Sequence, residues 1–329
     1  MSSHPAFEEA VEAVIDGDIA TLNRLLRANP DLVRARSSRP HHATLLHYVG
    51  ANGVEDERQR TPANAVEVAT LLLAAGADVN ARADMYGGSD TLGLVATSIH
   101  PLKAGVQDAL MTLLLARGAT VSGASGGAAS SSVINACLAN GRPSAAEFLA
   151  RHVEHLDLEA ASGLGRLDVV KTFFDQAGAL TAGATPQQMH DGFSWACEYG
   201  RTEVVDFLLG HGLDVGARLR PHQQTGLHWA AFGGHDRTVG VLLDRQAPLD
   251  ARDASFDGTP LGWALYAWGG GREEGAGDGY YEVVRMLVNA GATVAPEWLS
   301  DADRGFPLAA RIREDARMRG LLAPLRGLP

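Results

Sequence analysis

Cysteine is almost absent from this 329-residue sequence. Cys137 and Cys197 are the only two, and each lies in an apolar stretch, "SVINACLANG" or "FSWACEYG", without CxxC spacing. A disulfide framework or a structural zinc site needs paired or clustered cysteines, so neither is indicated here. We expect both thiols to be reduced and buried.

Positive charge is also scarce. Lys and Arg total 28 against 39 Asp and Glu, which gives a formal net charge of -11 at pH 7. No stretch gathers enough cations to reverse this locally, so nucleic acid and anionic membranes are not expected partners.

Long apolar runs are missing as well. No segment holds about 18 consecutive apolar residues. The N-terminus "MSSHPAFEEAVEAVIDGD" lacks the basic and apolar regions of a secretory signal. We therefore expect a soluble, cytoplasmic protein. Hydrophobic residues still make up 46% of the chain, enough for a core throughout.

What the sequence does contain is an internal repeat. The segments "SWACEYGRTEVVDFLLGHGLDVGAR" and "HWAAFGGHDRTVGVLLDRQAPLDAR" align without a gap at a spacing of 34 residues, as Trp195 and Trp229 show. Their shared tail recurs as "LLLAAGADVNAR", "LLLARGATVSG", "FFDQAGALTAG" and "LVNAGATVAP", and in degenerate form as "LLRANPDLVRAR" and "AAEFLARHVEHLDL". A fixed period of this length predicts a stack of repeats.

These copies predict an all-α solenoid over residues 1–295 with a C-terminal capping helix in 296–329. Each unit contributes two antiparallel helices and one projecting finger loop. Stacked neighbours would share one apolar core, and a cap would cover the last face. The eight predicted units are approximately 5–36, 43–82, 90–121, 130–155, 157–181, 190–218, 225–252 and 259–295.

The second helix of each unit explains why the units must stack. In "TEVVDFLLGHG", residues 204–209 place an apolar stripe at helical spacing, which a lone helix could not bury. We expect glycine to end this helix at a positive φ, where the chain turns out into the finger. The glycines are Gly76, Gly118, Gly178, Gly212 and Gly291.

Three short elements resemble the TPLH signature of ankyrin repeats: "TLLH" at 44–47, "TGLH" at 225–228 and "TPLG" at 259–262. The chain is similar to that family over about residues 5–295, in a form with long insertions. The resemblance implies that Thr44 pairs with His47 and Thr225 with His228, and that each histidine also holds the neighbouring loop. Gly262, and Gly93 in "DTLG", depart from the signature.

Binding residues should lie where the chain departs from the repeat pattern. Two lengthened fingers, 83–90 and 253–258, each carry an aspartate and an aromatic residue, which the sequence places at the same position in both. Fingers and first helices line the concave face in ankyrin stacks, so these residues are candidates to contact a ligand. Packing onto the next finger is the alternative. The candidates are Asp84, Tyr86, Asp253 and Phe256, together with Tyr266 and Trp268 on the first helix of the eighth predicted unit.

Catalysis remains a minority alternative. Insertions at 52–65, 98–105 and 269–279 lengthen three units between their helices. General acid–base chemistry, such as a cyclisation or isomerisation, could use Asp84, Tyr86, His100 and Glu55 if they converged across neighbouring units. No recognised nucleophile or metalloprotease motif is present.

Neither a metal nor a cofactor is expected. The run "HHATLLH" matches no zinc spacing, and the glycine-rich insertion lacks the order of a phosphate loop. The favoured function is a binding module whose concave groove takes a protein, a peptide or a small ligand.

Overall fold

A computed structural model describes residues 5–50, 55–121, 133–271, 279–299 and 308–323. The chain divides into two compact units, Met1–Glu154 and His155–Pro329, and each is described by itself. Most of both units is helical.

In the first unit, helices of successive pairs contact one another. Each first helix contacts the next first helix, and each second helix the next second helix. The helices are α1 (Pro5–Asp16), α2 (Ile19–Ala28), the 3₁₀ helices η1 (Pro30–Val33), η2 (Leu45–Gly50) and η3 (Asp56–Arg58), then α3 (Ala65–Ala74), α4 (Thr91–Thr97), α5 (Ile99–Lys103), α6 (Gln107–Ala116), α7 (Val133–Ala139) and α8 (Pro143–Ala150). Strands β1 (Arg82–Ala83) and β2 (Ser89–Asp90) pair antiparallel within one finger.

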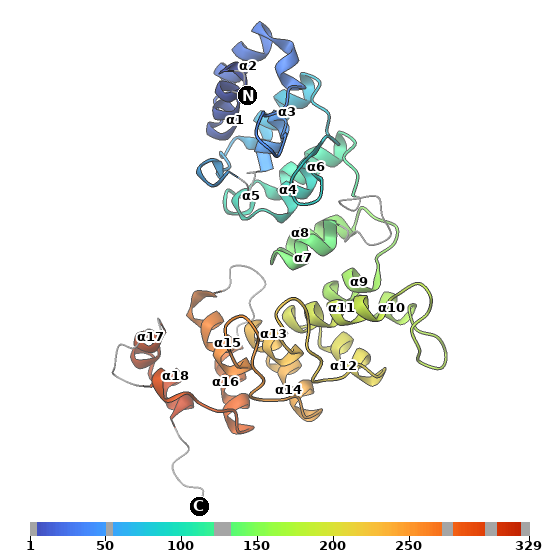
Figure 1. Ribbon diagram of the computed structural model, residues 1–329, viewed down its shortest axis with the longest axis vertical. Coiled ribbons are helices and arrows are strands. Elements are labelled where there is room, and N and C mark those ends of the chain that lie inside the picture. The colour runs from blue at the N-terminus through green and yellow to red at the C-terminus, as the bar shows by residue number, and fades with distance from the viewer. Residues whose placement is uncertain (1–4, 51–54, 122–132, 272–278, 300–307, 324–329) are drawn as a thin grey trace, which may run out of the picture. The chain divides into compact units, whose positions relative to one another are not determined.

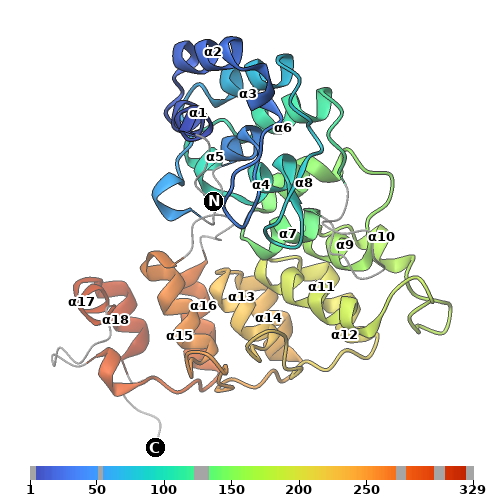
Figure 2. The same ribbon diagram turned by 45° about the horizontal axis from the view of Figure 1, so that its top comes forward.

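The second unit repeats this arrangement more regularly. The first helices α9, α11, α13 and α15 form one row and the second helices α10, α12, α14 and α16 the other (Figures 1 and 2). The elements are α9 (Leu158–Leu164), α10 (Leu167–Lys171), α11 (Pro186–Glu198), α12 (Thr202–Gly210), α13 (Gly226–Phe232), α14 (Asp236–Asp244), α15 (Pro260–Tyr266), the π-helical turn η4 (Ala267–Gly271), α16 (Tyr280–Asn289), the 3₁₀ turn η5 (Pro296–Trp298), α17 (Ala309–Glu314) and α18 (Ala316–Leu322).

The apolar stripe of the second helices forms the core between neighbours. In α12, Val204, Val205, Leu208 and Leu209 are buried, while Phe207 is half-buried and stacks on His211. All five glycines that were predicted to end second helices have a positive φ, between 81° and 98°. A residue with a Cβ would be strained there. The apolar stripe is confirmed, and four of the glycines follow the end of a second helix within two residues, whereas Gly178 lies in a turn after the end of α10 at Lys171.

Arginines of the recurrent "AR" tail join successive fingers. Nη1 of Arg218 donates hydrogen bonds to the carbonyl oxygens of Gln223 (3.1 Å), in its own finger, and of Arg252 (2.7 Å), in the next. One side chain therefore stabilises two consecutive fingers, which explains why Ala-Arg recurs in the repeat.

The first unit uses the same device. Arg36 Nη1 donates to the carbonyl oxygens of His42 (2.9 Å) and Arg82 (2.6 Å). The residue that accepts within the finger lies at a turn with positive φ, as at His42, Gln223 and Asp257. The finger turn is thus a repeated backbone feature that a neighbouring guanidinium holds in place.

The C-terminal segment differs from the single predicted helix. Its described residues form two short helices, α17 and α18, because Asp315 is extended between them and its carboxylate accepts from the backbone N–H of Met318. Ile312, Met318 and Leu322 are buried, and α18 contacts α16.

Both cysteines are buried, as the sequence predicted, and no disulfide joins them. Burial raises the pKa of the Cys197 thiol well above its usual value. Among the described residues, no helix has the length and apolar content to cross a membrane.

The three insertions differ in how much of them is described. Residues 98–105 contain α5, and residues 55–64 contain η3 and turns. Residues 52–54 and 272–278 lie outside the described part, so most of the glycine-rich insertion does too.

Candidate functional site

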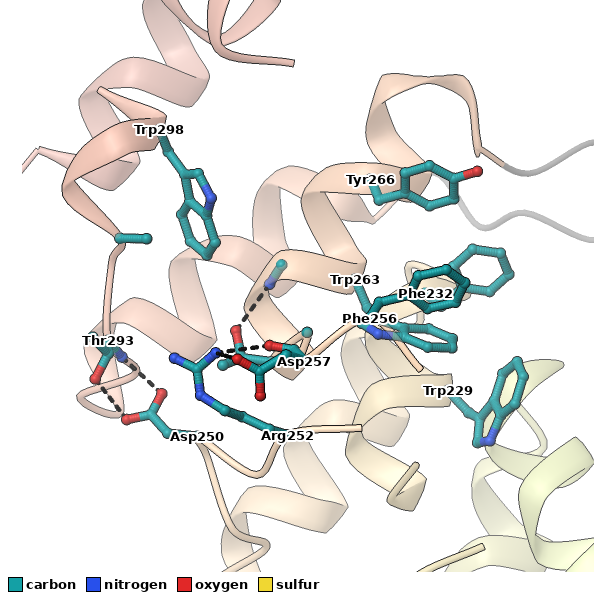
Figure 3. Close-up of a pocket in the computed structure, with 14 residues that line it drawn as sticks. Trp229, Phe232, Asp250, Arg252, Phe256, Asp257, Trp263, Tyr266, Thr293 and Trp298 are labelled. Carbon is teal, nitrogen blue, oxygen red and sulfur yellow. Dashed lines mark hydrogen bonds and ion pairs between the residues drawn. The ribbon is translucent and has the colours of Figure 1, made fainter. Parts of the chain in front are cut away.

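An aromatic pocket lies in the second unit, between the first helices α13 and α15 and the two fingers that follow α14 and α16. Its volume is about 710 Å³. In Figure 3, Trp298 stands on one side and most of the other aromatic rings are gathered on the opposite side. Its aromatic lining consists of Trp229, Phe232, Phe256, Trp263, Tyr266 and Trp298.

Trp263 is the centre of the aromatic wall. The rings of Trp229 and Phe232 meet it edge-on, with centroids 5.2 and 5.6 Å away. Tyr266 lies nearly parallel to Phe232 at 6.5 Å. Such edge and offset contacts suit the charge distribution of aromatic rings, so the wall is a packed group rather than a set of independent side chains.

Asp253 fixes the orientation of Trp263 in that wall. Its side chain is buried and accepts hydrogen bonds from Trp263 Nε1 (3.0 Å) and from the backbone N–H groups of Ser255 (2.8 Å), Phe256 (2.8 Å) and Gly258 (2.9 Å). Burial alone would raise the pKa of Asp253, but these donors leave it below the usual value. The carboxylate thus fixes both the finger turn and the indole.

His228 also holds this finger, through the carbonyl oxygen of Gly258. Its Nδ1 lies 3.0 Å from the backbone nitrogen of Thr225 and 2.9 Å from Thr225 Oγ1. Its Nε2 lies 3.1 Å from the carbonyl oxygen of Gly258, in the following finger. Burial lowers the pKa of His228 to about 4, so the ring is neutral at pH 7.

Another part of the pocket lining is polar. Arg252 Nη1 bonds the carbonyl oxygen and the carboxylate of Asp257 (2.7 and 2.9 Å). The carboxylate of Asp250 accepts from the backbone N–H and the hydroxyl of Thr293 (2.9 and 2.7 Å). These side chains of Asp250, Arg252 and Asp257 are exposed, so the charges border the solvent.

Two large apolar side chains of the pocket remain open to solvent. Phe256 is 78% exposed and Tyr266 is 57% exposed. Only one further large hydrophobic residue is comparably exposed in the described part of the chain, Tyr86 at 61%. All three were binding candidates from the sequence.

Trp268 lies elsewhere. It packs against Tyr281 at 6.3 Å, and the guanidinium of Arg311 covers its ring at 5.1 Å. Its aromatic face is therefore already occupied by the chain itself.

The finger of the first unit is built differently. Asp84, with 73% of its side chain exposed, pairs with His42 at 2.7 Å. Tyr86 sits at the finger turn with φ 49°. Behind the finger, Thr44 Oγ1 and His47 Nδ1 lie 2.8 Å apart, and burial lowers the pKa of His47 to about 4.

Backbone hydrogen bonds show that Asp84 and Asp253 are not equivalent. Asp84 N donates to the carbonyl oxygen of His41 in the preceding finger (2.7 Å), and Ala254 N donates likewise to His222 (2.8 Å). Asp84 therefore corresponds to Ala254, and the expectation of one shared aspartate position is wrong by one residue.

The four acid–base candidates each have separate surroundings. Asp84 pairs with His42, His100 lies 3.2 Å from Gln59 Oε1, and Tyr86 is exposed at its finger turn. Glu55, the fourth, is part of a different cluster.

Glu55 is buried and holds the segment that follows η2. Its Oε1 accepts from Tyr48 OH and lies 2.6 Å from His41 Nε2, while Arg39 and Arg58 bond Oε2 at 2.8 and 3.1 Å. Burial and the neighbouring Glu55 raise the pKa of Tyr48. With both oxygens engaged, Glu55 has a clear structural role. Within the described ranges, no three His, Cys, Asp or Glu side chains are arranged to hold a metal ion.

Sequence reasoning overlooked much of the pocket wall. Trp229 and Trp263 were not among the binding candidates, and they contact each other while lining the cavity. The available signal was their 34-residue spacing, which places two indoles at the same position of adjacent first helices. Trp298, Arg252 and Thr293 had no such signal.

Paired helices at a regular spacing, joined by fingers that arginines link, define a helical-repeat protein. The family model for ankyrin repeats in three copies matches residues 193–297. Residues 193–297 of this chain are therefore ankyrin repeats. Ankyrin repeats are in general protein-interaction modules, so a protein partner is the general expectation for this chain.

Proposed function

We propose that this chain binds a protein partner through the aromatic pocket between α13, α15 and the fingers at 250–259 and 293–298. The observation that carries the proposal is the exposure of Phe256 and Tyr266 at the mouth of a cavity of about 710 Å³. Large apolar side chains left open beside a concave surface are typical of interaction sites.

The composition of the pocket supports protein binding. Trp and Tyr are enriched among the residues that dominate interface energies, because they bury a large area and lose little side-chain freedom. The wall is also pre-organised, since Asp253 and His228 hold its finger before any partner arrives. Pre-organisation lowers the cost of association.

Asp84 and Tyr86 are a second proposed contact surface, in the first unit. Both side chains are exposed, and Asp84 is oriented by His42. Asp253 belongs to the proposed site only indirectly, as a positioning residue, and Trp268 is its weakest candidate because Arg311 covers it.

We also propose eight repeat units with the boundaries predicted from the sequence and a cap within 296–329. The alternation of paired helices in each unit supports this division. Burial of Ile312 and Met318 beside α16 supports the cap, because an uncovered last repeat would expose its apolar face.

Site-specific crosslinking tests the proposed surface. A photoreactive phenylalanine analogue is placed at Tyr266 in the full chain, and the chain is irradiated in extract from its source cells. We expect one discrete crosslinked protein. Its yield should fall when the chain that carries the analogue also carries Phe256→Ala. The control places the analogue at Asp244, which is exposed on α14 and outside the pocket. Equal crosslinking from 244 and 266 would contradict the proposal.

A further inference from the structure

We infer that the pocket receives an arginine side chain from a basic segment of the partner. This inference rests on the proposed function and adds the chemistry of the occupant. It follows from the charges around the cavity, from the faces that its rings present and from how the same unit pairs its own arginines.

The charges of the pocket favour a cation. The lining contains two carboxylates, Asp250 and Asp257, and one guanidinium, Arg252. The Arg252 charge is already matched by Asp257 at 2.9 Å, whereas the Asp250 carboxylate is bonded only to the uncharged groups of Thr293. The lining thus keeps an excess of one negative charge, in a chain whose formal net charge is -11. A cationic segment is complementary to both, and its approach is accelerated by the same field.

The aromatic wall offers ring faces to a ligand. The indole N–H of Trp263 is used by Asp253, so this ring presents its carbon framework to the cavity. Tyr266 and Phe256 are more than half exposed. Aromatic faces carry negative charge density and attract guanidinium and ammonium groups, with arginine the more frequent partner. Its planar group also stacks on rings, which the ammonium of lysine cannot do.

The second unit already contains this type of contact. Arg311 lies over Trp268 at 5.1 Å, and Arg317 lies over Tyr281 at 4.1 Å. Both arginines come from the C-terminal helices α17 and α18, and they cover rings of η4 and α16. The pocket presents rings of the same kind, with a carboxylate nearby, to an arginine from outside.

The test uses short peptides in which only the central side chain changes. The probes are acetyl-Gly-Gly-X-Gly-Gly-amide with X as arginine, citrulline, lysine, leucine or tryptophan, titrated into the isotopically labelled full chain and followed by two-dimensional NMR. Citrulline is the matched control, because it keeps the shape of arginine and removes the charge. We expect arginine to bind about 5- to 10-fold more tightly than citrulline, with shifts at residues 250–266.

Variants of the chain locate the effect. Tyr266→Ala and Asp250→Asn should each weaken arginine binding at least about 3-fold, while Asp244→Asn, which removes an exposed carboxylate outside the pocket, should not change it. Raising the salt concentration should weaken the binding of the arginine peptide and leave the binding of the citrulline peptide unchanged. Both variants alter side chains at the protein surface, so their spectra should show an intact fold.

Three results would overturn the inference. These are equal affinity for arginine and citrulline, tighter binding of the leucine or tryptophan peptide, and no shift at the pocket with any arginine peptide. Crosslinking from Tyr266 reports separately whether a protein binds there. A crosslinked partner together with a failed arginine series would retain the proposed function and reject the cationic occupant.

Discussion

The two lengthened fingers have similar composition and different construction. In residues 253–258 the aspartate directly follows the tail arginine, is buried and accepts four hydrogen bonds. In residues 83–90 the aspartate comes one position later, is exposed and pairs with His42, while Ala83 occupies the buried position. A shift of one residue thus separates a buried aspartate that stabilises its finger from an aspartate whose side chain is exposed. The comparison predicts clearly different consequences for substitutions in the two fingers.

Asp253→Ala should have the largest effect. It would leave the indole N–H of Trp263 and three backbone donors without their acceptor, and we expect a loss of about 4 kcal/mol from the free energy of unfolding. Urea unfolding followed by tryptophan fluorescence measures this, because all five tryptophans lie between residues 195 and 298. Asp253→Asn should lose less, since its amide oxygen can still accept. A loss below about 1 kcal/mol for the alanine variant would show that water replaces the carboxylate.

Lowering the pH should reduce the free energy of unfolding, because each finger is held by a buried histidine. The pKa of His228 and of His47 is about 4 in the folded chain, against the usual 6.5. Above pH 6.5 both states are neutral and nothing is lost. As the pH falls below 6.5, the unfolded chain takes up the proton first, so stability should fall by about 3 kcal/mol per histidine by pH 4.

Urea midpoints at pH 7, 6 and 5 test this before most carboxylates titrate. His228→Asn should be less stable at pH 7 but should show a shallower decline with pH. A slope equal to that of the parent chain would assign the pH dependence to other groups.

His228→Ala separates a finger tie from a binding residue. It removes the bonds to Thr225 and to the carbonyl oxygen of Gly258, and we expect a loss of about 2 kcal/mol. Partner binding should fall only as much as folding does, because His228 holds the finger and does not contact the partner. A large loss of affinity in a folded variant would move His228 into the contact surface.

Asp84→Ala and Tyr86→Ala should have the smallest effects on stability, at most about 0.5 kcal/mol, because both side chains are exposed. Circular dichroism is the appropriate measurement, since the first unit contains no tryptophan. If Tyr86→Ala lowers the free energy of unfolding by more than about 1 kcal/mol, the two fingers are more alike than their exposure indicates. If it alone weakens partner binding, the contact lies in the first unit.

Local and periodic features were predictable from the sequence. The apolar stripes, the positive-φ glycines and the burial of both cysteines depend on the spacing of residues within one repeat, and any neighbour of the same kind satisfies them. The acidic and aromatic residues of the fingers were also visible. Their roles were not, because the sequence alignment of the fingers carried no information about which backbone groups pair across them.

The sequence by itself determined a repeat protein and its helix pairs, since these follow from pattern and polarity. Only the tertiary structure decided that Asp253 is buried, that Arg311 covers Trp268, and that indoles from adjacent helices line one cavity with Trp298. The last two outcomes depend on contacts between residues about 30 to 70 positions apart, and the burial of Asp253 depends on a one-residue offset between fingers whose meaning the hydrogen bonds reveal. The offset matters because a carboxylate one position further along the chain points to a different environment. Two fingers with the same residue types therefore place their aspartates differently.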